Sequence, residues 1–287
     1  MASQSAGPLK GIKIIIIQRA FILPKRGNVT VAALSQHYKG DDNLNYEPLR
    51  ITFDMTTPIA LPLKKQPYPM HLDSLVIGIL TGLRKEIFES IHNNKYAPGK
   101  NSDVPLAVSG TESPIYCASV AMTAKDVQRN WYGITKKPPT EEEMRMYRPQ
   151  ENATYKQAGE GSGIYRAWME EVQTVFPHQI IFECQGDKQA LWDILTNVRR
   201  IGVLRRAGMG EVINMNIESI GNPQAGLIYN EQPARMLPVV DWPEGEQKQW
   251  HKIAAGVRAP YWHPANREIC WAPPVDTTIP NFSVVDL

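Results

Sequence analysis

The sequence predicts an α+β protein with a ferredoxin-like (RRM-like) core, in which two helices pack against one face of a mostly antiparallel sheet. Three observations lead to this fold class. Residues 49–55 alternate between apolar and polar side chains, as a half-buried strand does. Residues 72–91 carry apolar side chains at three- and four-residue steps, which is the pattern of an amphipathic helix. A strand, a helix and a strand then follow between residues 179 and 220.

The first half of the core is preceded by a segment of different character. Ile12–Ile17 is a short β-branched run that predicts a strand, and residues 24–48 have the composition of a loop. After the long helix, two short extended runs at 104–108 and 115–122 are separated by a turn-like sequence. In the strand at 49–55, the side chains expected to face the core are those of Leu49, Ile51, Phe53 and Met55.

The second half of the core repeats the strand and helix patterns. Residues 179–185 alternate again, and Asp187 is placed to cap the N-terminus of the following helix. That helix is expected to bury one face, formed by Ala190, Leu191, Ile194, Leu195 and Val198. The last strand, at 211–220, is expected to turn one side inward, formed by Ile213, Met215 and Ile217.

Two regions depart from this core. Residues 125–166 are polar, with an acidic cluster at Glu141–Glu143 and a glycine-rich stretch at 159–163, and predict an insertion that projects from the domain. Residues 231–287 are rich in proline and tryptophan without regular periodicity, and predict an irregular C-terminal arm that packs onto the domain or onto a neighbouring subunit. We therefore expect an N-terminal segment (1–48), a core domain (49–230) and the arm.

Composition excludes several classes of function. The formal net charge of +2 is too small to indicate a polyanion partner by itself, so any such case must rest on local patches. The three cysteines are widely spaced, which argues against a disulfide framework and a zinc site. No nucleotide-binding or metal motif is present, and no cofactor is expected. Without a signal peptide or an apolar run long enough for a bilayer, the chain is expected to be cytoplasmic, with no membrane partner.

The most informative segment is the stretch at 198–217, between the second helix and the last strand. It contains two arginine pairs among three glycines, namely Arg199, Arg200, Gly202, Arg205, Arg206, Gly208 and Gly210. Glycine permits positive φ and close backbone approach, and arginine donates two hydrogen bonds at once to phosphate oxygens. The segment is therefore a candidate binding site for a sugar-phosphate backbone. A solvated helix end with a glycine cap explains the same residues, and both interpretations stay open at this point.

Further candidate contacts lie elsewhere in the sequence. His71, at the start of the long helix, is placed to bind phosphate, to act in acid–base chemistry, or simply to cap the helix. Near or within the insertion, basic and aromatic residues could contact the nucleic-acid backbone and stack on bases. These outlying candidates are Lys125, Arg129, Lys136, Lys137, Tyr116, Trp131 and Tyr132.

Three pieces of sequence together resemble one family. They are the helix opener at 71–76, the segment 114–119, which ends at Ser119, and the loop at 201–212. The whole resembles the subunit that caps the 5′ end of the guide RNA in type IV CRISPR effector complexes. That subunit belongs to the repeat-associated mysterious protein superfamily, which has a glycine-rich loop after the second helix of a ferredoxin-like domain. The resemblance covers roughly residues 49–220.

The resemblance implies a role and a set of partners. The chain would grip the 5′ handle of the guide RNA, begin the filament of backbone subunits, and lie beside the large-subunit-like protein where target DNA is read near the protospacer-adjacent motif. A helicase would join the complex. The loop, His71, Tyr116 and Ser119 would contact RNA, and the insertion would be a thumb laid against RNA or the next subunit. Binding without catalysis is expected.

Two alternatives remain from the sequence. One is a metal-independent ribonuclease specific for the CRISPR repeat, built on the same fold, in which His71 and nearby tyrosines would act. The other is a structural subunit that contacts only protein, with the tryptophan-rich arm as its interface. An ordinary RRM is excluded, because its aromatic RNP motif is absent.

Overall fold

The computed structural model describes residues 44–60, 70–83, 104–124, 127–136, 168–274 and 283–285. Its centre is a sheet of five described strands in the order β15-β5-β8-β1-β9. These strands are β15 (Ser283–Val285), β5 (Met122–Ala124), β8 (Gln179–Asp187), β1 (Tyr46–Met55) and β9 (Val212–Ser219). All neighbours are antiparallel except β15 and β5, which are parallel. The run Ile12–Ile17 lies outside the described residues.

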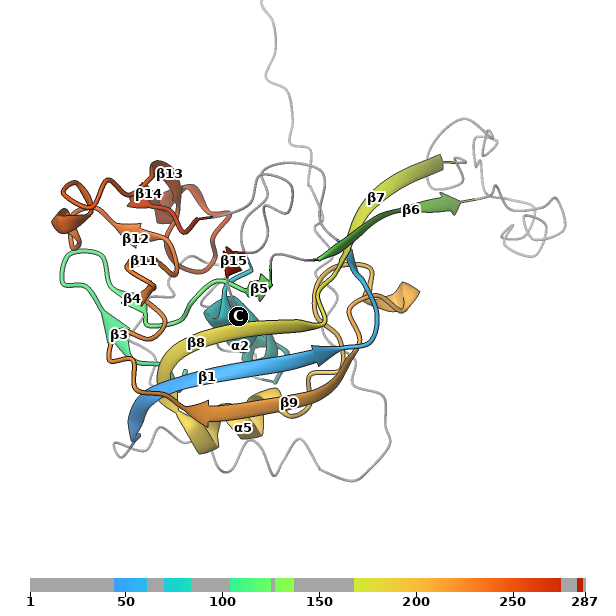
Figure 1. The fold of residues 1–287 in the computed structure, drawn as a ribbon, viewed down its shortest axis with the longest axis horizontal. Coiled ribbons are helices and arrows are strands. Elements are labelled where there is room, and N and C mark those ends of the chain that lie inside the picture. Colours follow the sequence, from blue (N-terminus) through green and yellow to red (C-terminus); the bar gives the residue numbers. More distant parts are fainter. Residues whose placement is uncertain are drawn as a thin grey trace, which may run out of the picture.

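Two helices lie behind this sheet in Figure 1, α2 (Leu72–Leu83) and α5 (Lys188–Leu195). Strand β1 turns its odd-numbered side chains toward them, and Leu49, Ile51 and Phe53 have no exposed surface. The alternation predicted at 49–55 is confirmed, as is the helix cap, where the Asp187 carboxylate accepts from the Ala190 N–H at 2.9 Å. The α+β class and the mostly antiparallel sheet are confirmed among the described residues.

Strand β9 differs from its prediction at one residue. The register with β1 shifts after Asp54, which pairs with Asn214, whereas Met55 pairs with Val212. Ile213 is the extra residue of this irregularity, and its side chain is 66% exposed. The expectation that Ile213 faces the core is therefore wrong, because the bulge turns Val212 inward in its place.

The predicted insertion begins as one strand of a long β-ribbon. Strand β6 (Gln128–Lys136) pairs along its whole length with β7 (Trp168–Phe176), and β7 also pairs with the short β2 (Ile59–Ala60). The ribbon extends away from the central sheet at the upper right of Figure 1. The projection expected of residues 125–166 is thus seen in their described part, 127–136.

Residues 231–274 lie at the opposite end of the molecule from the ribbon, at the upper left of Figure 1. The short β12 (Leu237–Pro238), β13 (Lys252–Gly256) and β14 (Arg267–Trp271) form a small sheet. Three of the four tryptophans here, Trp242, Trp250 and Trp271, are buried together with Ile115 and Cys117. The remaining described elements are short pieces, namely β3 (Val108–Ser109), β4 (Ile115–Tyr116), β10 (Ile228–Tyr229), β11 (Gln232–Pro233), η2 (Arg205–Ala207), η3 (Pro243–Gly245) and η4 (Pro264–Asn266).

Asp241 ties the turn before β4 to this C-terminal region. Its carboxylate accepts hydrogen bonds from the backbone N–H groups of Thr111, Glu112 and Ser113 at 2.9–3.1 Å. Partial burial acts to raise the pKa of Asp241, but these hydrogen bonds outweigh it and lower the pKa below 3.8. The carboxylate form therefore stabilises the folded chain.

We expect Asp241→Asn to lower the free energy of unfolding by about 1 kcal/mol at pH 7, because it removes charge-assisted hydrogen bonds that are partly exposed to solvent. Since the folded pKa is depressed, this contribution is present above the unfolded pKa and is lost as pH falls through the folded value. Urea unfolding of both proteins between pH 7 and pH 3 should show the difference shrinking below about pH 4. A difference that stays constant across this range would contradict the assignment.

Candidate nucleic-acid interface

The arginine–glycine loop, residues 198–211, is closed at its base by backbone hydrogen bonds. The Ile201 N–H donates to the Gly210 carbonyl at 2.8 Å, and the Val212 N–H donates to the Arg199 carbonyl at 3.0 Å. Arg200 and Glu211 form an antiparallel bridge between the two arms. These contacts join the two arms of the loop, one leading from α5 and the other into β9, and hold the loop in a defined conformation.

Four residues of the loop have left-handed backbone conformations. Three are the predicted glycines, Gly202 at φ +91°, Gly208 at +88° and Gly210 at +68°, and the fourth is Leu204 at +56°. A Cβ atom at Gly202 would approach the Ile59 side chain to 2.6 Å, and one at Gly210 would lie 1.8 Å from the Ile201 carbonyl oxygen. Glycine is therefore required at both positions by conformation and by space.

We expect Gly210→Ala to destabilise the protein by about 2 kcal/mol or more, because a left-handed conformation costs an alanine roughly 1–2 kcal/mol and the clash adds to it. Gly208→Ala is the matched control, since it has positive φ but no atom within 4 Å of the added Cβ. It should cost only about 1 kcal/mol. Chemical denaturation of both variants measures the difference, and equal losses would argue against this loop geometry.

The arginine–glycine loop pairs with β2, which in turn pairs with β7 of the β6–β7 ribbon. Val203 bridges Ala60 of β2, and Ala60 in turn pairs with Thr174 of β7. The Gly210 N–H donates to the Pro58 carbonyl at 2.8 Å. Met209 packs with Ala60 and Val172 in a small apolar cluster. Loop, β2, β7 and β6 therefore form one laterally continuous surface.

The four arginines of the loop have different roles. Arg205 and Arg206 lie on the one-turn helix η2 at the tip, where Arg206 is exposed and Arg205 is partly buried. Arg199 is exposed at the base. Arg200 instead donates from Nη1 to the Arg205 carbonyl at 2.5 Å, and its Nη2 lies 3.8 Å from the Glu211 carboxylate. Arg200 thus braces the turn that presents the other two.

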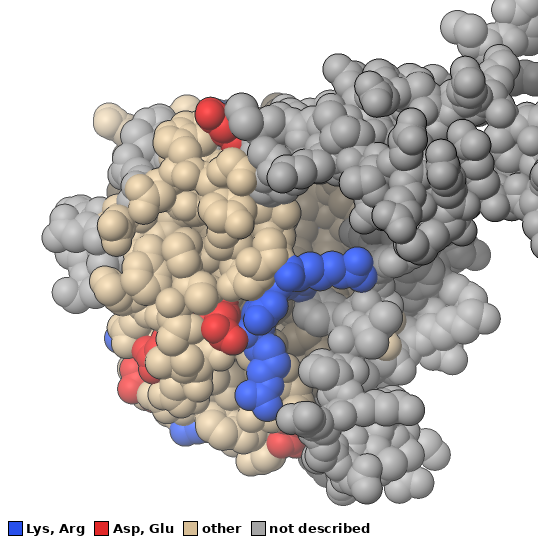
Figure 2. Space-filling model, turned by 90° about the vertical axis from the view of Figure 1, so that its right-hand side faces the viewer, with Lys and Arg blue, Asp and Glu red and all other residues tan. Residues whose placement is uncertain are grey.

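Burial lowers the pKa of Arg205, yet a guanidinium stays charged throughout the physiological range. Helix η2 is the short orange turn to the right of the central sheet and below the ribbon in Figure 1. Figure 2 looks onto that side and shows Lys and Arg side chains gathered in a stripe, with an acidic group beside it. The loop side of the molecule is therefore locally basic although the whole chain is almost neutral.

The ribbon adds two exposed aromatic rings. Trp131 is 64% exposed and Tyr132 is 44% exposed. Tyr132 pairs with Val172 across the ribbon, and paired residues share a face, so Tyr132 lies on the face that packs against Met209 of the loop. Trp131 lies on the other face. Arg129 and Lys136 are also in β6, whereas Lys125 and Lys137 lie outside the described residues.

Two predicted contact residues lie in the interior instead. Tyr116 is 2% exposed, and Ser119 has no exposed surface. The Ser119 hydroxyl accepts from the Glu183 N–H and donates to the Val120 carbonyl, both at 2.9 Å. Because the segment 115–120 runs through the core, both side chains contribute to the interior packing and do not belong to the candidate interface.

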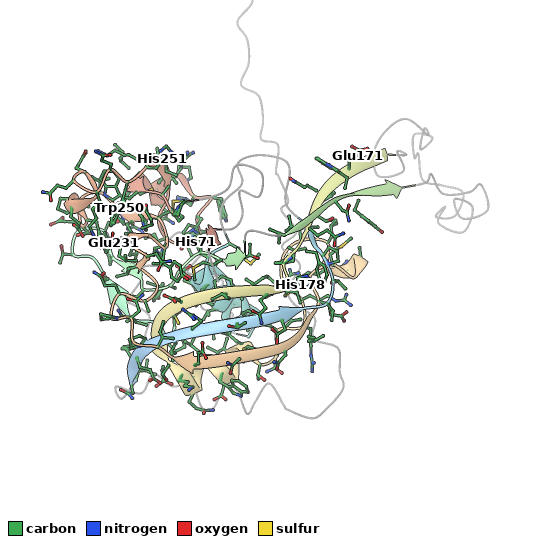
Figure 3. The ribbon with its side chains drawn as sticks, in the orientation of Figure 1. His71, Glu171, His178, Glu231, Trp250 and His251 are labelled. Carbon is green, nitrogen blue, oxygen red and sulfur yellow. The ribbon has the colours of Figure 1, made fainter. Side chains whose placement is uncertain are left out.

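His71 is also separated from the loop. It is 2% exposed, and its ring stacks on that of Tyr261 with the centroids 4.1 Å apart. Burial, with a smaller contribution from Arg235, lowers the pKa of His71 well below its usual value. Figure 3 shows His71 on the C-terminal side of the molecule, far from the ribbon that carries Glu171. The structure does not bring His71 and the arginine pairs together.

Comparison with known protein families shows to which family the chain belongs. Residues 47–273 match the model of the CRISPR type IV associated protein Csf3. The chain belongs to the Csf3 family. The resemblance to a type IV CRISPR subunit is confirmed at this level, and the match extends past residue 220 into the C-terminal region. Among curated proteins, no match to the chain is found.

In this Csf3-family chain, a buried polar cluster lies beneath His71 that the sequence did not reveal. Arg235 has no exposed surface, and its Nη2 lies 3.6 Å from the carboxylate of Asp73, which is equally buried. The Tyr261 hydroxyl donates to that carboxylate at 2.7 Å and accepts from Arg235 at 3.0 Å. Arg235 also donates to the carbonyls of Tyr116, Ala118 and Val257. The cluster fastens the C-terminal region to the start of α2.

The described part of the Csf3-family chain contains no group of three or more His, Cys, Asp or Glu side chains placed to hold a metal ion. The cysteines are all buried, and burial raises the pKa of Cys117 and of Cys270 to about 11. These thiols are therefore protonated at neutral pH. Among the helices that the structure describes, none is long and apolar enough to span a bilayer.

Proposed function

We propose that this Csf3-family protein is a non-catalytic subunit of a type IV CRISPR complex that binds the 5′ handle of the guide RNA and caps the filament of backbone subunits. The observation that carries the proposal is the presentation of Arg205 and Arg206 on a braced glycine loop that is continuous with the aromatic-bearing ribbon. Membership of the family supports a role in a type IV CRISPR complex, and the loop geometry supports the proposed contact with RNA.

The arrangement suits recognition of a nucleic-acid backbone more than of base sequence. Guanidinium groups bind phosphate oxygens in a bidentate manner, and a loop already held in shape loses little conformational entropy on binding. Tyr132, on the loop-facing side of the ribbon, is placed to stack on an unpaired base. In RNA-guided complexes, pairing between guide and target reads the sequence, so a handle-binding subunit needs only backbone and shape contacts.

The strand order supports a ferredoxin-like interpretation of the core. Strands β5, β8, β1 and β9 are adjacent in that order, with α2 between β1 and β5 in the chain and α5 between β8 and β9. This order fits the β-α-β-β-α-β arrangement that we propose for the core, with β15 as an added edge strand. In such a unit, the arginine–glycine loop follows the second helix, as the superfamily resemblance implies.

The proposed partners follow from this role. They are the guide RNA, the backbone-filament subunit, the large-subunit-like protein, target DNA near the protospacer-adjacent motif, and a helicase that joins the complex in the cytoplasm. The ribonuclease alternative loses its main support, because His71 is enclosed by protein and its pKa is lowered. A general acid–base group must reach the proton that it transfers.

Purification of the assembly from its host, followed by sequencing of the bound small RNA, tests the proposal. We expect RNAs that share one constant 5′ segment, protected from added nuclease when this subunit is present and exposed when it is omitted. Incubation of the pure protein with repeat RNA should leave the RNA full length. An assembly without RNA, or cleavage of the repeat RNA, would overturn the proposal.

A further inference from the structure

The open face of the central sheet, opposite the helices, is a polar groove distinct from the arginine–glycine loop. Residues of β1, β8 and β9, together with Tyr229, line a hollow of about 540 Å³. Its charged lining residues are Arg50, Asp54 and Glu218. Arg50 is already paired, at 2.9 Å with Glu183 and at 4.0 Å with Glu218. The groove therefore presents an excess of carboxylate, which disfavours an RNA phosphate and favours a cation.

The groove is bordered by an open strand edge. Strand β9 ends the five-stranded sheet, and in the described part of the chain no strand pairs with its outer side. The Ile220 N–H donates to the Pro48 carbonyl at 2.9 Å. Because bonded and non-bonded pairs alternate in an antiparallel ladder, Met215, Ile217 and Ser219 direct their N–H and C=O groups outward. This edge is thus a template for another strand.

Of the features that usually protect an open edge, strand β9 has a bulge at Ile213 and one charge at Glu218, near its two ends, and the stretch between them is unprotected. The sequence of β9, Val-Ile-Asn-Met-Asn-Ile-Glu-Ser, has neither lysine nor proline, the residues that block strand addition in many natural sheets. It also exposes Ile213. A free edge of this kind favours β-strand addition, in which main-chain hydrogen bonds give affinity and alternate side chains give specificity.

We propose that β9 accepts an extended segment of another protein subunit of the type IV complex, with lysine or arginine at alternate positions facing the groove. The side chains of Asn214, Asn216 and Glu218 lie on the groove face, because they alternate along the strand with Met215 and Ile217, which pack with the core. A strand added beside them places every second side chain next to amides and carboxylates. The guide RNA would bind at the loop, so the two partners occupy different sites. This inference rests on membership of the complex and is independent of RNA binding.

Site-specific photocrosslinking tests the contact in the assembled complex. With p-benzoylphenylalanine at position 213, we expect irradiation to join this chain to another protein subunit at a segment that contains lysine or arginine. A crosslink to RNA, a crosslink within this chain, or no crosslink would each overturn the proposal. The same reagent at position 269, on the exposed Ile269 of β14, is the control for nonspecific capture.

A charge-adding variant separates this site from the RNA site. Ile213→Lys with Asn216→Lys places two cations on the strand edge and the groove, which repel a basic segment but cannot repel RNA. We expect recovery of the docked subunit to fall about tenfold while binding of guide RNA by the isolated protein is unchanged. The matched control is Ile269→Lys with Gln247→Lys, which alters one exposed isoleucine and one exposed amide elsewhere. Equal recovery of the subunit with both variants would overturn the proposal. A rise in RNA affinity with the first variant and not with its control would place RNA at this edge and would also overturn it.

Discussion

Arg205→Glu combined with Arg206→Glu will remove guide RNA from the protein while leaving the fold intact. Both side chains lie on η2 at the tip of the loop, and no residue of η2 is buried, so we expect charge reversal there to leave the core packed. A charge-assisted hydrogen bond to phosphate contributes about 1.5 kcal/mol or more, so two lost contacts correspond to at least about a 100-fold loss of affinity. Repulsion by the introduced carboxylates increases the loss.

The salt dependence of binding provides a second measurement of the same variant. Each phosphate contact to single-stranded RNA contributes about 0.7 to the slope of log affinity against log salt concentration. The double variant should therefore reduce the slope by roughly 1.4. A fluorescence titration between 50 and 300 mM salt would show it.

Lys248→Glu with Arg267→Glu is the matched control for this experiment. It makes the same change in net charge at exposed positions in the C-terminal region, on the side of the molecule opposite the loop. We expect it to leave RNA affinity within about twofold of the unaltered protein. If the control weakens binding as much as the loop variant does, the contact is a general charge effect and the loop has no special role.

The regular elements of the core could be predicted because local pattern and tertiary burial agree there. Leu49, Ile51 and Phe53 alternate in the sequence and all face the helices. Asp187 has the residue type and spacing of a helix cap, and it caps α5. The three loop glycines could also be recognised from the sequence. A backbone with positive φ strongly favours glycine, so the residue type itself indicates the conformation.

Prediction from the sequence failed where position in the fold depends on distant residues. Ile213 has the right spacing to face the core, but a single-residue bulge against β1 turns it outward. The β6–β7 ribbon has no strong alternation, because exposed rings such as Trp131 and Tyr132 occupy both faces. A half-buried strand has an apolar side that marks it in the sequence, and a projecting ribbon does not.

The interior polar residues show a different limit. His71, Tyr116 and Ser119 bear groups that bind nucleic acid in many proteins, yet here they are enclosed by segments distant in sequence. Arg235 gave no signal at all, because a buried arginine cannot be distinguished from an exposed one by its neighbours in a proline-rich segment. Only the structure shows that Asp73 and Tyr261, far apart in the chain, converge on it.

Arg235→Met will be the most destabilising single substitution that we predict, lowering the free energy of unfolding by about 3–5 kcal/mol. It leaves the Asp73 carboxylate buried without its counterion, and it removes the donors to three carbonyl groups. Burial is the largest influence on the pKa of Asp73 and raises it, while Arg235 acts in the opposite direction. Urea denaturation at neutral pH measures the loss, with Arg267→Met, at an exposed arginine, as the control that should stay within about 0.5 kcal/mol.

A double-mutant cycle separates the ion pair from the rest of the cluster. Adding Asp73→Asn to Arg235→Met removes the unpaired charge, so the combined loss should be smaller than the sum of the two single losses. The Tyr261 hydroxyl can still donate to the amide oxygen at position 73, which keeps that end of the contact satisfied. Additive losses would mean that Arg235 acts only through the backbone carbonyls. In either case, a large loss would show that the C-terminal region depends for its stability on its attachment to the start of α2, because the cluster joins these two segments.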